Sequence, residues 1–135
     1  MLPIVIHSRD AAKDTLDLLK RTDAAANGGD IHCFSYSRES AREFLDLGFH
    51  LGIGGVLTFK NAQKIKEVVQ YMPLSRILLE TDAPYLTPEP FRGKRNHSAY
   101  LSYVVKAIAE IKGIPAEKVL ETVNENARSL FHIEE

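Results

Sequence analysis

The sequence predicts an α/β fold in which parallel β-strands alternate with α-helices. Short, continuous apolar runs recur along the chain, as expected for strands that are buried on both faces of a sheet. Each run is followed by a segment whose apolar residues have helical spacing, and the unit repeats about every 25 residues. Four such units in succession favour parallel strands joined by right-handed crossovers.

The first unit begins with the β-branched run Ile4–Ile6, which ends at His7. Asp10 precedes the predicted helix, as a residue suited to a helix N-terminus. The segment 27–29, Asn-Gly-Gly, then ends the unit. The apolar positions that indicate the helix are Ala12, Leu16 and Leu19.

The second and third units follow the same plan. Strands are predicted over 30–34 and 49–53, and each is followed by an amphipathic helix. Gly48 is expected just past the end of the first of these helices, and Pro73 prevents the second from continuing. Their apolar positions are Ala41, Phe44 and Leu45 in the first helix and Ile65, Val68, Val69 and Met72 in the second.

The fourth strand is predicted over 76–80, and a proline-rich loop follows it. A long helix then ends at Gly113, and Pro115 suits the first turn of another, short helix. A last segment carries one apolar stripe, so the tail is expected to pack against the rest of the chain. The stripe consists of Val123, Ala127, Leu130 and Phe131.

Composition is that of one soluble globular domain over residues 1–135. Of the 135 residues, 44% are hydrophobic and 26% are charged, and the net charge is −1. Basic residues are spread along the chain, which excludes a protein that coats nucleic acid through one basic face. No apolar run reaches the roughly 20 residues that span a bilayer, and the N-terminus lacks the pattern of a signal peptide. We therefore expect no membrane partner and a cytoplasmic location.

The single cysteine, Cys33, lies between His32 and Phe34 in the second predicted strand. One cysteine has no partner for an intramolecular disulfide. We interpret Cys33 as a small core residue and not as a catalytic thiol.

Three residues with metal-ligating side chains stand at equivalent places in the repeat. His7 and His32 end the first two strands, and Asp82 follows the fourth. Each residue alone is weak evidence for a metal site, because a strand-end histidine is often an ordinary polar residue and Asp82 suits a turn. Together they form a set of two nitrogens and one oxygen at the C-terminal rim, where barrel active sites lie. Such a set suits Zn, Mn, Fe or, less well, Mg, and a metal held there would activate water.

Other residues near this rim are open to two interpretations. Arg9 could bind two phosphate oxygens, or it could form a surface ion pair with Asp10 or Asp14. The glycine-rich segment 52–55 could approach a phosphate, although a tight strand-to-helix turn is the favoured interpretation. Glu80 ends a buried strand and needs a partner, for which we favour Arg95 or Arg9. Among the remaining histidines, His50 and His132 are expected to be structural or solvated, and a site role for His97 stays open.

Five segments together resemble the TatD family of metal-dependent deoxyribonucleases, in the family's order and at similar spacing. The segments are IVIHSRDA, IHCFS, GIGGVLTFKNA, ILLETDAPYLTPEPFRGKRN and NARSLF. The resemblance implies a TIM-barrel-type fold of (β/α) repeats, of which this chain supplies about half, corresponding to strands five to eight. It further implies that His7 and His32 bind one metal ion, that Asp82 binds the other and is catalytic, and that Arg9, Arg95 and Asn96 contact substrate phosphates.

The resemblance also identifies what this chain lacks. The family's first strand carries a His-x-His pair and a middle strand carries a bridging carboxylate, and this sequence has no His-x-His. His97 also stands where many members have an acidic residue. We therefore expect a hydrolase that cleaves phosphodiester bonds of DNA with divalent ions such as Zn, Mn or Mg, and little activity from this chain alone. A non-catalytic half-barrel module and an amidohydrolase-type enzyme are the alternatives.

The predicted half-barrel has two open edges, near Ile4–Ile6 and Ile77–Leu79. Unpaired backbone groups on such edges favour pairing with another chain. We therefore predict that the chain assembles with itself through these edges.

Overall fold

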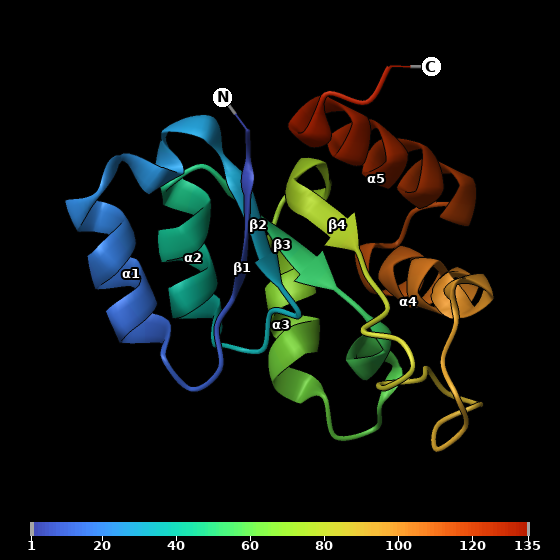
Figure 1. Cartoon of the computed structure of the whole chain (residues 1–135). Coiled ribbons are helices and arrows are strands. Elements are labelled where there is room, and N and C mark those ends of the chain that lie inside the picture. Colours follow the sequence, from blue (N-terminus) through green and yellow to red (C-terminus); the bar gives the residue numbers. More distant parts are fainter. Residues whose placement is uncertain (1, 135) are drawn as a thin grey trace.

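The computed structural model describes residues 2–134, which form a parallel sheet with helices along one face and around its ends (Figure 1). The four strands are β1 (Ile4–His7), β2 (Gly29–His32), β3 (Phe49–Ile53) and β4 (Ile77–Leu79). Their order in the sheet is β1-β2-β3-β4, and every neighbouring pair is parallel. The predicted α/β class is confirmed, and β1 and β4 are the two edges of the sheet within the described residues.

The helices follow the strands as the sequence predicts. They are α1 (Ala12–Arg21), α2 (Arg38–Asp46), α3 (Gln63–Tyr71), α4 (Leu101–Lys112) and α5 (Ala116–Phe131). Gly48 and Gly113 have φ angles of 94° and 64° just past α2 and α4, so both serve the helix ends for which the sequence marks them. Short 3-10 helices occupy 23–27, 55–58, 74–76 and 98–100.

Two predictions differ from the structure by more than one residue at an element boundary. Strand β2 ends at His32, two residues earlier than predicted, because Cys33 has a φ angle of 48° and leaves the extended conformation. The expected short helix after Pro115 and the final apolar segment form one continuous helix, α5, with Pro115 as its N-cap residue. Proline is tolerated at a helix start because its missing N–H would have no partner there.

The hydrophobic core lies between one face of the sheet and the helices. Ile31, Leu51 and Ile77 are register partners in β2, β3 and β4, and all three are fully buried on this face. Phe44 from α2 and Phe49 from β3 are fully buried beside them. We call this face the outer face of the sheet and the opposite one the inner face.

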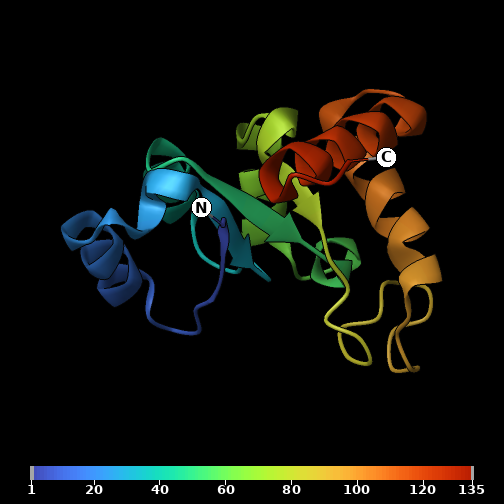
Figure 2. The same cartoon turned by 45° about the horizontal axis from the view of Figure 1, so that its top comes forward.

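The C-terminal helix is anchored to the sheet by a buried amide. Asn126 of α5 donates from Nδ2 to the carbonyls of Leu74 and Ile77, at 2.9 Å each. Figure 2 shows α5 crossing the β4 end of the sheet, so the tail packs down as predicted. Among residues 2–134, no helix combines the length and apolar character needed to cross a membrane.

Candidate metal centre

Parallel register brings the two predicted histidines to the same edge of the sheet. His7 is the register partner of His32, so both side chains leave the C-terminal ends of neighbouring strands on the inner face. Their ring centroids lie 6.2 Å apart. Asp82 follows β4 by three residues, and its Oδ1 lies 3.6 Å from Nε2 of His32. His32 is therefore closest to Asp82, and His7 stands beside this pair.

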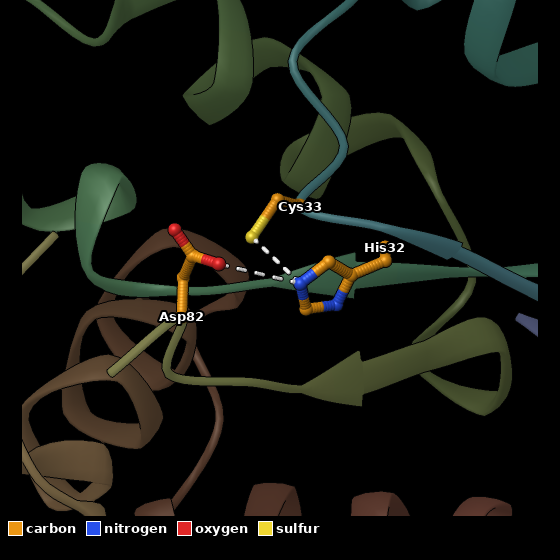
Figure 3. A group of neighbouring side chains, drawn as sticks. All are labelled: His32, Cys33 and Asp82. Carbon is orange, nitrogen blue, oxygen red and sulfur yellow. Dashed lines mark hydrogen bonds and ion pairs between the residues drawn. The ribbon is translucent and has the colours of Figure 1, made fainter. Parts of the chain in front are cut away.

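Cys33 is the neighbour that the sequence interpretation missed. Its Sγ lies 3.5 Å from Nε2 of His32, and Figure 3 shows the side chains of His32, Cys33 and Asp82 directed toward one another. Adjacent strand residues point to opposite faces, so a continued strand would have turned Cys33 away from His32. Because the φ angle of Cys33 is 48°, the chain turns and brings the thiol to the same side. The predicted core role is therefore wrong, and the side chain is half-buried at the rim.

Glu80 orients His32 from behind. Its Oε2 lies 2.5 Å from Nδ1 of His32, and its Oε1 accepts a short hydrogen bond from the backbone N–H of Cys33. The partner of Glu80 is thus His32 instead of the expected Arg9 or Arg95. A hydrogen bond at Nδ1 leaves Nε2 of His32 free to face Cys33 and Asp82.

A glycine in β3 makes this contact possible. Gly52 follows Leu51, the register partner of Ile31, and therefore lies beside His32 on the inner face. A Cβ atom at Gly52 would lie 2.3 Å from the carboxylate of Glu80. The absence of a side chain lets Glu80 reach across β3 from β4 to β2.

The other glycines in this segment allow close backbone packing. A Cβ at Gly55 would lie 2.1 Å from the carbonyl oxygen of Leu86. This supports the interpretation of 52–55 as a tight strand-to-helix turn.

A second carboxylate, Asp30, is buried on the inner face below His32. Its side chain is 5% exposed, and its Oδ1 has no hydrogen-bond partner among the described residues. Burial, followed by the charge of Glu80, raises the pKa of Asp30 to about 7. Burial also raises the pKa of Glu80, although His32 and the N–H of Cys33 oppose the shift.

Burial and the surrounding carboxylates affect the thiol as well. Burial comes first, followed by the charges of Glu80 and Asp82, and together they raise the pKa of Cys33 well above its usual range. The raised pKa favours the neutral thiol.

The residues predicted to bind phosphate occupy different places. Arg9 lines a cavity of about 450 Å³ together with His7, Cys33 and Asp82. Arg95 lines a separate surface hollow beside the proline-rich loop. The structure therefore brings Arg9, but not Arg95, into one cavity with the rim residues.

Asn96 is engaged within the proline-rich loop. It is 4% exposed, and its Nδ2 donates to the carbonyls of Thr81 and Tyr85 at 2.8 Å each. Its Oδ1 accepts from the N–H of His97. These contacts hold the chain next to Asp82 in place, which is a positioning role.

The remaining histidines lie outside the cluster around His32. The ring of His97 packs on Tyr100 with centroids 4.0 Å apart, and burial lowers the pKa of His50. His132 ends α5 with a φ angle of 54°.

Sequence reasoning missed Cys33 and Asp30 as neighbours of His32 for different reasons. The period-two rule places Asp30 and His32 on one face of β2, so the alternation contained a usable signal for Asp30. The direction of the Cys33 side chain depends on the backbone turn at this residue. The sequence does not indicate this turn, because Cys33 lies inside an apolar run.

Comparison with known proteins agrees with this architecture. The model of the family described as TatD related DNase matches residues 1–132. An uncharacterized metal-dependent hydrolase of Bacillus subtilis, YabD, is 52% identical over 98% of this chain and 52% of its own length. The uncharacterized metal-dependent hydrolase YcfH of Escherichia coli is 42% identical over 98% of this chain and 50% of its own length. The chain therefore spans about half the length of the curated relatives it matches.

Solved structures give the same result. The TatD homolog YjjV of Escherichia coli superposes with a TM-score of 0.90 at 33% identity, covering 98% of this chain and 51% of that one. A TatD family hydrolase of Entamoeba histolytica has the same fold, with a TM-score of 0.86 at 22% identity over 96% of this chain and 50% of that one. The expected relationship to half of a TIM-type barrel is thus confirmed. By its match across residues 1–132, this chain belongs to the TatD related DNase family.

Proposed function

We propose that this chain forms half of a metal-dependent hydrolase that cleaves phosphodiester bonds of DNA. The observation that carries the proposal is the arrangement of His32, with Glu80 at one ring nitrogen and Asp82 near the other. A carboxylate that fixes the tautomer of a histidine is the usual outer partner of a metal-bound imidazole.

The residues present fit a divalent ion. His7 and His32, whose ring centroids lie 6.2 Å apart, would bind one ion. Asp82, with its Oδ1 3.6 Å from Nε2 of His32, would bind the other ion of a two-metal site. Such a donor set suits Zn, Mn or Mg, and an ion bound there supplies Lewis acidity and an activated water.

The chain's own residues have separable roles in this proposal. Glu80 holds His32 in the orientation in which Nε2 faces Asp82. Arg9 lines the same cavity, where its guanidinium matches two phosphate oxygens. Asp82 is the catalytic carboxylate, Arg95 adds positive charge beside the proline-rich loop, and Asn96 holds that loop.

Self-association through the sheet edges is part of the proposal. A hollow of about 690 Å³ lies between β4 and the helices α4 and α5. Its lining includes Leu79 of the β4 edge, and Leu120 and Phe131 of α5 are 47% and 38% exposed. Val5 of the opposite edge strand is 58% exposed. A second copy would cover such edges, whereas a monodisperse monomer in light scattering at tens of micromolar would contradict this part.

Low activity of the chain alone is also expected. The relatives are about twice as long as this chain. The proposed metal ligands on this chain are three, His7, His32 and Asp82. Incomplete ligation weakens metal binding, and two-metal catalysis needs both ions about 3.5–4 Å apart. We also propose the cytoplasm as the location, which cell fractionation would test.

The experiment measures metal content and DNA cleavage on the same purified samples. Asp82→Ala should reduce bound divalent metal and remove any cleavage that a chelator abolishes, while leaving the melting temperature nearly unchanged. His97→Ala is the matched control, because its ring packs on Tyr100 outside the cluster.

The alternatives make different predictions in this experiment. A protein that takes up no metal, with or without Asp82, would be a non-catalytic module. Metal-dependent cleavage of amides or lactones, without cleavage of phosphodiesters, would instead identify an amidohydrolase-type enzyme.

A further inference from the structure

The loop between β4 and α4 carries an exposed tyrosine without a side-chain partner (Figure 1). Tyr85 is 70% exposed, and within residues 2–134 its ring pairs with no other ring or cation. The other four tyrosines each contact a ring, a cation or a hydroxyl group: Tyr36, Tyr71, Tyr100 and Tyr103. One exposed tyrosine is ordinary on a protein surface, so its position decides what it can do.

Tyr85 stands between two hollows of the surface. Together with Leu86 it lines the rim cavity of about 450 Å³ that also includes Arg9 and Asp82. The same two residues line a second hollow of about 540 Å³ beside the proline-rich loop. A polymer bound at Asp82 can therefore continue past Tyr85 into the second hollow.

The second hollow is positively charged. Arg92, Lys94 and Arg95 line it and are exposed, and its described lining residues include no carboxylate. None of these three cations forms an ion pair with another residue of 2–134. Cζ of Arg92 lies 3.8 Å from the ring centroid of Phe59, a cation–π contact that fixes the guanidinium. Unpaired cations gathered in one hollow favour a ligand that carries phosphate groups.

Hydrogen bonds hold the tyrosine and the cations at fixed places in the loop. Nδ2 of Asn96 donates to the carbonyl of Tyr85 at 2.8 Å, and the hydroxyl of Thr87 donates to the carbonyl of Lys94. The N–H of Tyr85 donates to the carbonyl of Asp82 at 2.9 Å, which ties the tyrosine to the candidate metal centre. These contacts form without a ligand, so a ligand that binds here has less of the loop to order.

We propose that Tyr85 is a specificity-determining residue on which the base next to the scissile phosphate stacks, while Arg92 and Lys94 bind the phosphate beyond it. This rests on the proposed function, which places the scissile phosphate near Asp82, and adds a second nucleotide subsite. Every base has a flat aromatic face, so a tyrosine accepts any unpaired base while basic side chains hold the backbone. An acidic peptide would satisfy the cations but needs no flat ring beside them, so the combination favours nucleic acid.

A strand without bases tests the stacking contact. The probes are a short, fluorescently labelled single-stranded DNA and an abasic sugar-phosphate strand of the same length. Fluorescence anisotropy in chelator, where metal-dependent cleavage cannot occur, measures the affinity for each. We expect the chain to bind the normal strand at least about 5- to 100-fold more tightly, because one stacked base contributes about this factor. Tyr85→Ala should weaken binding of the normal strand by about the same factor and leave the abasic strand unchanged.

Matched variants separate stacking from charge. Tyr85→Phe keeps the aromatic face and should keep the preference for the normal strand. Tyr71→Ala removes an exposed tyrosine of α3 that lines neither hollow, and should leave both affinities unchanged. Arg92→Gln and Lys94→Gln should weaken both strands alike and make the plot of log affinity against log salt less steep by about 0.7 each. Circular dichroism of each variant establishes that it is folded.

The outcomes distinguish this inference from the proposed function. Asp82-dependent metal uptake and cleavage, with equal affinity for the two strands or no effect of Tyr85→Ala, would overturn this inference and keep the proposed function. Base-dependent binding that Tyr85→Ala removes, in a folded chain that takes up no metal, would support the subsite and reject the hydrolase. Failure of the folded chain to bind either strand at low salt would overturn the subsite.

Discussion

The two faces of the sheet carry different kinds of residue. On the outer face, Ile31, Leu51 and Ile77 are register partners and are fully buried against the helices. On the inner face, the same strand β2 places Asp30 and His32, which contribute ionisable groups instead of apolar contacts. Because successive strand residues point to opposite faces, each strand serves both purposes at once. Residues that stabilise the core and residues of the candidate site therefore alternate along the strand.

The largest expected effect comes from the outer face. Leu51→Ala removes a fully buried side chain at the centre of β3 and should lower the free energy of unfolding by about 2–5 kcal/mol. Urea denaturation measures the change. The matched control is Val5→Ala on the inner face, where Val5 is 58% exposed and the loss should be well under 1 kcal/mol. Equal losses at the two positions would contradict the division between the faces.

A charge removed from the inner face should stabilise the protein. The folded-state pKa of Asp30 is about 7, raised from 3.8, so ionisation is less favourable in the folded state. Protonated Asp30 contributes favourably to the free energy of unfolding. This contribution is complete below pH 4 and is lost as pH rises through about 7. At about 1.4 kcal/mol per pH unit, Asp30→Asn should therefore gain roughly 2–4 kcal/mol at pH 8 in chelator and little at pH 4. Urea denaturation at both pH values measures this, and a gain that is independent of pH would rule out the explanation.

The contact of Glu80 with His32 across β3 should affect metal affinity more than it affects the stability of the fold. In Gly52→Ala the new Cβ would meet the carboxylate of Glu80 at 2.3 Å, so Glu80 must move away from His32. Zinc affinity should fall about 10- to 100-fold, the usual result when the outer partner of a ligating histidine is lost. Competition with a coloured chelator measures the affinity. Unchanged affinity in a folded variant would show that Glu80 does not orient the ligand.

The smallest effect is expected at the surface. Lys20 of α1 and Glu43 of α2 form an ion pair at 2.7 Å, with side chains that are 47% and 44% exposed. Lys20→Ala should change the melting temperature only slightly, since solvent and salt screen exposed ion pairs and these contribute little to stability. A larger loss would mean that this ion pair, and not only buried apolar contacts, holds α1 against α2.

The repeating pattern of apolar runs was sufficient to predict the strands, their parallel order and the helices. It also placed His7, His32 and Asp82 at one rim, because each ends or follows a strand in the same register. The partner of Glu80 could not be predicted, since it depends on the space above Gly52. The position of Cys33 could not be predicted either, because a single φ angle of 48° decides on which side the thiol lies.

The strand order β1-β2-β3-β4 also bears on how the chain folds. Each strand pairs with the one made just before it, so every pairing joins residues only about 20 to 26 positions apart, which costs little entropy. The sheet is therefore suited to growing strand by strand during synthesis. Asn126 makes a longer-range contact: its amide reaches back 52 residues to the carbonyl of Leu74 and joins α5 to the sheet.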